Sequence, residues 1–122
     1  FARSKKLNQT LFLMTLQESK CEACRIDAPL VTENEKVEFM SELSGWEINN
    51  IEGIDQLAKV FNFDSYLQAL DFAKAVALLA EEEDHHPKIV LEWGRVEVHW
   101  WSHKIKGLHK NDFICAAKTD HI

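Results

Sequence analysis

The sequence has few cysteines, few glycines and prolines, and fewer basic than acidic residues, and each shortage excludes a class of protein. Three cysteines cannot all pair with one another, which disfavours a secreted disulfide framework and favours a reducing compartment. Four glycines and two prolines supply no glycine-rich phosphate loop and no linker. Fourteen Lys and Arg against twenty Asp and Glu argue against a nucleic-acid binder, because phosphate contacts need clustered cations.

The remaining composition is that of an ordinary globular domain. The chain has 122 residues, of which 46% are hydrophobic and 28% charged, which is the size of one domain. No apolar run approaches the roughly 18 residues that a membrane span requires. We therefore expect a soluble, acidic, cytoplasmic protein that binds neither membrane nor nucleic acid.

The N-terminal part differs from the rest of the chain. We interpret residues 1–30 as an irregular segment and residues 31–122 as a single domain. The first residues imitate a signal peptide only faintly, because polar residues interrupt the apolar stretch and no small-residue cleavage site follows. We expect the natural chain to begin at Met14, with residues 1–13 as upstream or added sequence.

Hydrophobic periodicity predicts seven elements in residues 32–122. They are a helix capped by Thr32 and running to Leu43, strands Trp46–Asn49 and Ile54–Phe63, a helix from an Asp64 cap to about Glu83, strands Lys88–Trp93 and Arg95–Ser102, and a helix Asn111–Lys118 capped by Asn111 or Asp112. This order, α-β-β-α-β-β-α, predicts an α+β fold. We expect two layers, with a four-stranded antiparallel sheet and the helices on one face.

Core-facing positions can be predicted for some of these elements. In the long helix the spacing favours a buried stripe of Leu67, Leu70, Ala73, Ala77 and Ala80, widened by Tyr66, Ala69 and Val76. In the first helix the stripe is Val37, Met40 and Leu43. The buried face of strand 54–63 stays open, because both of its alternating sets contain apolar residues.

A cluster of acidic residues and histidines ends the long helix. Residues 81–84 are all acidic and precede His85, His86 and Pro87. A charge run alone usually marks a solvated face. However, Glu81 lies four residues before His85, so the two can hydrogen-bond if the helix extends that far. A carboxylate partner would fix the imidazole tautomer and suit it to proton transfer near neutral pH.

A second group of candidates lies in and after the last strand. Alternation places Val96, Val98 and Trp100 toward the core, and His99, Trp101 and His103 on the opposite face. His103, near the strand end, is better placed for function than His99, which we interpret as a cross-strand or surface residue. An N-cap role alone would explain Asp112.

Metal and thiol chemistry are weaker hypotheses. Cys21 and Cys24 have the spacing of metal ligands, but no second such pair exists and a zinc site needs three or four ligands. We expect no metal, and we interpret these cysteines as reduced thiols in a loose segment, with a redox or metal role as the minor alternative. Cys115 is interpreted as a packing residue.

Seven residues in the second half of the chain keep a spacing typical of one family. They are Glu81, His85, His86, Pro87, Trp93, His103 and Asp112. The sequence here resembles the pterin-4a-carbinolamine dehydratase family, above all its bacterial members, and every position of the family pattern is filled. Segments 21–25, 92–94, 100–103 and 106–113 also resemble the bacterial branch, so the resemblance covers about residues 14–122.

The resemblance implies an enzyme that dehydrates 4a-hydroxytetrahydrobiopterin to quinonoid dihydropterin. This activity supports tetrahydropterin recycling for aromatic amino-acid hydroxylases such as phenylalanine hydroxylase. The pterin is the substrate, and no cofactor is implied. His85 and His103 would transfer protons and His86 would mainly bind the pterin. Glu81 and Asp112 would orient imidazoles, and Trp93 would pack the wall of the site.

The resemblance also leaves a non-catalytic alternative. Vertebrate relatives serve as dimerisation cofactors of a homeodomain transcription factor, so a regulatory role through a protein partner is the second hypothesis. Family members are homodimers or homotetramers, and the sequence does not distinguish between these.

Overall fold

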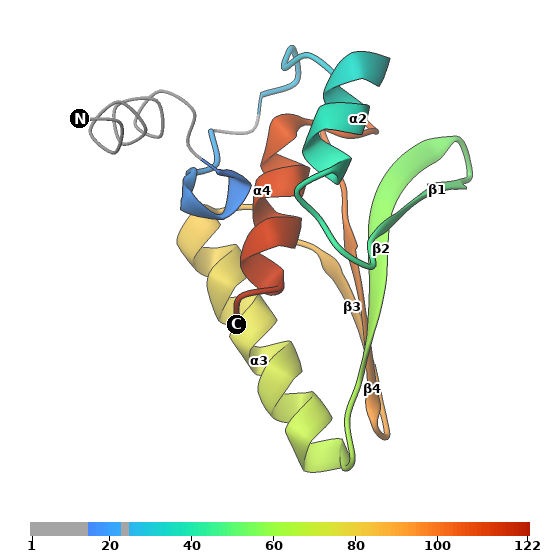
Figure 1. The fold of residues 1–122 in the computed structure, drawn as a ribbon, viewed down its shortest axis with the longest axis vertical. Coiled ribbons are helices and arrows are strands. Elements are labelled where there is room, and N and C mark those ends of the chain that lie inside the picture. The colour runs from blue at the N-terminus through green and yellow to red at the C-terminus, as the bar shows by residue number, and fades with distance from the viewer. Residues whose placement is uncertain (1–14, 23–24) are drawn as a thin grey trace, which may run out of the picture.

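The protein folds into a four-stranded sheet covered by helices on one face (Figure 1). The computed structural model describes residues 15–22 and 25–122, so the expected start at Met14 and the thiol of Cys24 lie outside the described residues. In chain order the elements are η1 (Leu16–Glu18, a 3₁₀ helix), α2 (Glu33–Met40), β1 (Glu47–Ile51), β2 (Ile54–Asn62), α3 (Tyr66–Glu83), β3 (Lys88–Glu92), β4 (Arg95–Trp100) and α4 (Lys110–Thr119).

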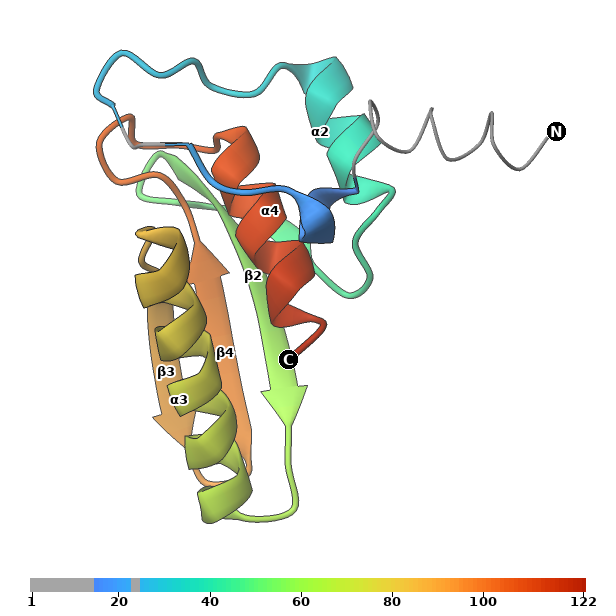
Figure 2. The same ribbon diagram turned by 90° about the vertical axis from the view of Figure 1, so that its left-hand side faces the viewer.

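This arrangement confirms the predicted α+β class. All neighbouring strands are antiparallel, in the order β1-β2-β4-β3. Figure 2 shows α3 and α4 side by side on the same face of the sheet. No helix within the described ranges is long and apolar enough to cross a membrane.

The first helix begins as its sequence predicts. The Thr32 hydroxyl accepts a hydrogen bond from the Glu35 N–H at 3.1 Å, and the Glu35 carboxylate accepts one from the Thr32 N–H at 2.8 Å. This reciprocal capping box satisfies two amide groups that have no partner inside the helix. Of the predicted stripe, Met40 and Leu43 pack against the core, whereas Val37 is exposed, and Phe39 is the buried residue of α2.

The other two helices begin at different residues from those predicted. Ser65, not Asp64, caps α3 by accepting a hydrogen bond from the Gln68 N–H. His109, not Asn111 or Asp112, caps α4. An imidazole nitrogen is an uncommon N-cap acceptor. The usual preference for Asn and Asp therefore placed the predicted start of this helix at Asn111 or Asp112, after its true cap.

The sheet resolves the ambiguity of the second strand. Leu57 pairs with Trp100 in the register of β2 and β4, and both side chains are fully buried against the helices. Lys59 shares this face, and its Nζ reaches Asp120 Oδ1 at 2.7 Å and the Ser44 carbonyl at 2.7 Å. A lysine can lie on the core face because its aliphatic stem is buried while its charge is paired at the edge. On β4, Val96 and Val98 are buried as predicted.

The buried stripe of α3 matches the predicted one in part. Ala69, Val76 and Ala80 are buried as predicted, and Glu83 is buried as well. Leu67 and Leu70, which were predicted to face the core, are exposed. Apolar residues surround most of this helix, so periodicity alone does not select one face. Phe72, Ala73 and Leu79 also pack against the core from this helix.

Residues 15–22, in the segment predicted to be irregular, pack against the core formed by the rest of the chain. Leu16 is 2% exposed and lies in the same apolar cluster as Trp100 and Phe113. The Leu16 N–H donates to Glu42 Oε1 at 3.0 Å, and the Cys21 N–H donates to Glu83 Oε1 at 3.0 Å. Residues 15–22 therefore form part of the folded unit.

Glu83 should contribute pH-dependent stability. Burial acts to raise the pKa of this carboxyl, but the hydrogen bond from the Cys21 N–H and the ion pair with Lys118 outweigh it, so the pKa lies below its ordinary value. A lowered folded-state pKa stabilises the fold above the unfolded-state value, and this contribution is lost as pH falls through the folded-state pKa.

We expect Glu83→Gln to lower the free energy of unfolding by about 1–3 kcal/mol at neutral pH. Urea titrations of the two proteins between about pH 7 and pH 3 should show this difference shrinking on acidification. Glu82→Gln, on the exposed side of the same turn, is the matched control and should change little. A difference that stays constant with pH would contradict an ionised Glu83.

Candidate active site

A left-handed turn at Asp84 sets the geometry of the histidine cluster. The helix α3 ends at Glu83, and Asp84 has φ 50° and ψ 42°. Asp adopts this region more readily than most residues other than Gly. The turn brings the His85 N–H to the carbonyl of Ala80 at 3.1 Å. As a result His85 turns into the protein and His86 turns outward.

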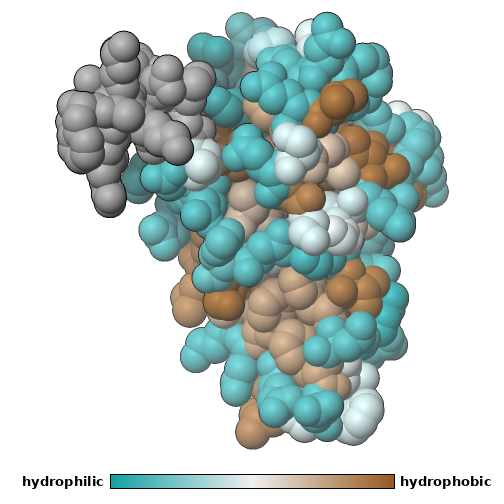
Figure 3. All heavy atoms as spheres, viewed as in Figure 1, coloured by the Kyte–Doolittle hydropathy of each residue, from teal (hydrophilic) through white to brown (hydrophobic). Residues whose placement is uncertain are grey.

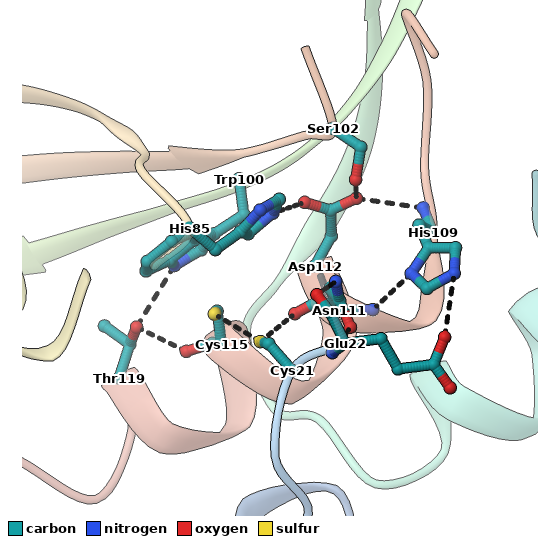
Figure 4. Close-up of polar contacts among 10 residues, drawn as sticks. All are labelled: Cys21, Glu22, His85, Trp100, Ser102, His109, Asn111, Asp112, Cys115 and Thr119. Carbon is teal, nitrogen blue, oxygen red and sulfur yellow. Dashed lines mark hydrogen bonds and ion pairs between the residues drawn. The ribbon is translucent and has the colours of Figure 1, made fainter. Parts of the chain in front are cut away.

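His85 is held in the interior by Asp112. Its Nε2 lies 2.6 Å from Asp112 Oδ1, and the residues are 3% and 0% exposed (Figure 4). The imidazole also stacks on the Trp100 ring at a centroid distance of 5.8 Å and an interplanar angle of 7°. An ionised carboxylate only accepts hydrogen bonds, so the proton of this pair belongs on Nε2.

Asp112 receives three hydrogen bonds through its two carboxylate oxygens. Besides the bond from His85, its Oδ2 accepts from the Ser102 hydroxyl at 2.8 Å and from the His109 N–H at 2.9 Å (Figure 4). Hydrogen bonds to an ionised carboxylate are stronger than neutral ones. Asp112 therefore fixes both the tautomer and the orientation of His85.

Glu81 pairs with a different histidine from the one predicted. Its Oε2 lies 2.5 Å from His86 Nε2, not from His85. The prediction assumed that the helix continues to His85, and the turn at Asp84 rotates the chain so that the next residue reaches Glu81 instead. The Glu81 and His86 side chains are 75% and 56% exposed, so this pair adds little stability.

His103 lies in the loop after β4. It is exposed, and its ring stacks on Trp101 at 4.3 Å with an interplanar angle of 17°. The strand ends at Trp100, two residues earlier than predicted, because Ser102 pairs only with Gly107 in an isolated bridge. His103 therefore lies beyond the strand, and the alternation of side chains along β4 does not set its direction.

His99 lies on the sheet face opposite the core. It is buried, with Nδ1 3.0 Å from Gln56 Oε1 on β2 and Nε2 3.3 Å from Glu97 Oε2. This arrangement agrees with the cross-strand interpretation. His99 makes no part of the histidine cleft described next.

His85, His86 and His103 meet at one open cleft. Together with Asp84 and Lys104 they line a hollow of about 290 Å³, near the lower end of the roughly 300–1,000 Å³ typical of ligand pockets. A neighbouring hollow beside Ser102 and His109 measures only about 10 Å³, no more than about one water molecule. The histidine cleft is therefore the candidate active site.

Trp93 does not join this cleft. It is 70% exposed in the turn between β3 and β4, at the far end of β3 from His86. The predicted contribution of Trp93 to the wall of the site is thus not seen within one chain.

In the described part of the chain, no group of three or more His, Cys, Asp or Glu residues is arranged to hold a metal ion.

Sequence reasoning missed two residues of this region. Ser102 binds the buried carboxylate of Asp112, and Lys104 lines the cleft. Their positions on either side of His103 were the available indication, but a serine and a lysine in a loop carry no specific pattern. The spacing of the motif did identify Asp112. Because its carboxylate is fully buried, it holds His85 from the interior of the protein and does not face a ligand.

The comparisons with known proteins agree on one family. The sequence profile described as "Pterin 4 alpha carbinolamine dehydratase" matches residues 29–122. A relative from Vibrio vulnificus is 59% identical over 107 residues, covering 88% of this chain and 97% of the relative. One from Saccharophagus degradans is 56% identical over 107 residues, covering 88% and 95%. Both are provisionally named pterin-4-alpha-carbinolamine dehydratases.

Two solved structures share the fold. A transcriptional coactivator/pterin dehydratase from Brucella melitensis has a TM-score of 0.68 and 30% identity, over 76% of this chain and 97% of that one. A pterin dehydratase-like protein identified as a RuBisCO assembly factor in the alpha-carboxysome has a TM-score of 0.54 and 26% identity, over 66% and 90%. With the profile match and the close relatives, these findings show that the chain belongs to the pterin-4a-carbinolamine dehydratase family.

Proposed function

We propose that this protein dehydrates 4a-hydroxytetrahydrobiopterin, or a closely related 4a-hydroxytetrahydropterin, to quinonoid dihydropterin. The observation that carries the proposal is the convergence of His85, His86 and His103 on one cleft, with His85 fixed by a buried carboxylate. Family membership makes the pterin the expected occupant. Loss of water changes no oxidation state, so the reaction needs no redox cofactor.

The reaction requires one proton donor and one proton acceptor. A base removes the proton from N5 of the pterin, and an acid protonates the departing 4a-hydroxyl group. We assign the base to His85, because a neutral imidazole with its proton on Nε2 has an unprotonated Nδ1. The resulting imidazolium would be stabilised by Asp112 at 2.6 Å.

We assign the acid to His103 and substrate binding mainly to His86. His103 stands in the exposed loop across the cleft, where it can exchange protons with solvent between turnovers. His86 is oriented by Glu81 at the rim. Each well-placed acid or base typically contributes about 10²–10⁴ in rate.

Ultraviolet absorbance of freshly generated 4a-hydroxytetrahydropterin tests the proposal. Wild-type protein should accelerate its disappearance above the spontaneous rate, and the double variant His85→Ala/His103→Ala should not. Circular dichroism of both proteins controls for folding. If the folded wild-type protein gives no acceleration, the dehydratase assignment is wrong.

A second candidate function is binding of a protein partner without catalysis. The long helix α3 leaves large apolar side chains exposed, including Leu67, Leu70 and Leu78. Brown and tan atoms extend over this part of the surface in Figure 3. The Brucella melitensis protein is described as a transcriptional coactivator as well as a pterin dehydratase, and the second solved relative as a RuBisCO assembly factor. A partner-binding role would survive the double histidine variant, whereas the enzymatic role would not.

The wider setting follows from the proposed reaction. We infer that the substrate comes from an aromatic amino-acid hydroxylase such as phenylalanine hydroxylase, and that the protein acts in the cytoplasm as a homodimer or homotetramer. Size-exclusion chromatography with light scattering measures the oligomeric state directly.

A further inference from the structure

Two cysteines that are distant in the sequence meet beside the candidate active site. Cys21 Sγ lies 3.4 Å from Cys115 Sγ, across a separation of 94 positions in the chain (Figure 4). Cys115 is fully buried in α4, and Cys21 is half-buried in the segment that follows η1. Neither the dehydration chemistry nor the histidine cleft uses these thiols.

The surrounding hydrogen bonds hold the two thiols together. The Cys21 N–H donates to Glu83 Oε1 at 3.0 Å. The next residue, Glu22, forms two hydrogen bonds with the Asn111 side chain. The Glu22 N–H donates to Asn111 Oδ1 at 2.9 Å, and Asn111 Nδ2 donates to the Glu22 carbonyl at 2.8 Å. Three contacts therefore dock this segment on α3 and α4, so the approach of the thiols follows from fixed backbone positions.

We propose that Cys21 and Cys115 form a reversible disulfide when the protein meets an oxidising low-molecular-weight disulfide. A disulfide has its sulfur atoms about 2.05 Å apart, so they must approach by about 1.4 Å. Cys21 lies outside any helix or strand, which allows its side chain to make most of this movement while α4 stays in place.

The reaction consists of two thiol–disulfide exchanges. The Cys21 thiolate attacks one sulfur of glutathione disulfide, breaks its S–S bond and releases one glutathione thiolate. Cys115 then loses its proton to solvent and attacks Cys21 Sγ, which releases the second glutathione. The two cysteines together lose two electrons and two protons, and the glutathione disulfide is reduced to two thiols.

The environment of the two thiols sets the order of these steps. The hydrogen bond with Cys21 and burial raise the pKa of the Cys115 thiol well above its ordinary range, and the nearby Asp112 and Glu83 carboxylates add to this effect. Because only the thiolate is the nucleophile, the more exposed Cys21 reacts first. The mixed disulfide on Cys21 is thus the intermediate, and the rate of closure should rise with pH.

The bond would fasten the N-terminal segment to the helix that carries Asp112. It would close a loop covering most of the chain, which restricts the unfolded state. We therefore expect the oxidised protein to have a Tm higher by at least about 5 °C. Reduction with dithiothreitol should return the Tm to its starting value.

The test is equilibration of the full-length reduced protein in buffers of increasing glutathione disulfide to glutathione ratio. Acid quenching, alkylation and peptide mass mapping then identify the bonded cysteines. The wild-type protein and Cys24→Ser should both form the Cys21–Cys115 bond and lose two hydrogens in mass. Cys21→Ser should lose the bond, and Cys115→Ser should stop at the mixed disulfide on Cys21.

Three results would overturn the proposal. These are a bond between Cys21 and Cys24 in the wild-type protein, a bond between two chains, or free thiols throughout the range of ratios. If Cys115→Ser does not fold because the site is buried, Cys21→Ser serves alone, since its half-buried position tolerates the change. The readouts are mass and Tm, so the outcome does not depend on whether the protein is a dehydratase.

Discussion

Replacing His85 with Gln is expected to lower kcat for pterin dehydration by about 10²–10⁴-fold. Glutamine is similar in length to histidine and can still donate a hydrogen bond to Asp112, but it cannot take up a proton. The variant should therefore keep a buried hydrogen bond to Asp112 in place of the 2.6 Å contact of His85, and it should remain folded. Stopped-flow absorbance with freshly generated substrate measures kcat and KM separately.

His86→Gln is the matched control for this prediction. His86 follows His85 in the sequence but lies at the rim of the histidine cleft, where its partner Glu81 is exposed. We expect this variant to raise KM with a much smaller change in kcat, as for the loss of a binding contact. Equal reductions in kcat for the two variants would refute the division of roles. An unchanged kcat for His85→Gln would remove His85 from the mechanism.

Asp112→Asn is expected to lower the free energy of unfolding by about 3–5 kcal/mol and also to reduce kcat. The carboxylate accepts from His85, Ser102 and the His109 N–H and is itself 0% exposed. An amide of the same shape turns one acceptor oxygen into a donor, so at least one buried donor loses its partner. Urea denaturation at neutral pH measures the loss.

Ser102→Ala provides the graded comparison. It removes one of the three hydrogen bonds to Asp112 and leaves the others in place, so the expected cost is about 1 kcal/mol. A loss of only that size for Asp112→Asn itself would mean that Asp112 is protonated in the folded state. In that case the carboxylate could not stabilise a charged His85, and the assignment of His85 as the base would fail.

The order of elements could be read from the sequence because it depends on local patterns. The Thr32 capping box and the alternation of Val96, Val98 and Trp100 each act over a few residues. Backbone propensity and side-chain period determine such features without knowledge of the rest of the chain. The spacing of the histidine motif is likewise a property of the sequence alone.

The partners of the site residues were decided only by the tertiary structure. Sequence spacing predicted a contact between Glu81 and His85. Because Asp84 adopts a left-handed conformation and ends the helix, Glu81 contacts His86 instead. The true partner of His85 lies 27 positions away, on another helix. Spacing rules hold only while an element continues, and they say nothing about which element packs against it.

The same reason explains the remaining differences. The buried face of α3, the place of Leu16 in the core and the meeting of Cys21 with Cys115 all depend on contacts between segments far apart in the chain. The sequence by itself determined the elements, their order and the residue types available for proton transfer. The packing of α3 and α4 on one sheet face decided which of those residues meet, because close packing selects among faces that local periodicity leaves equivalent.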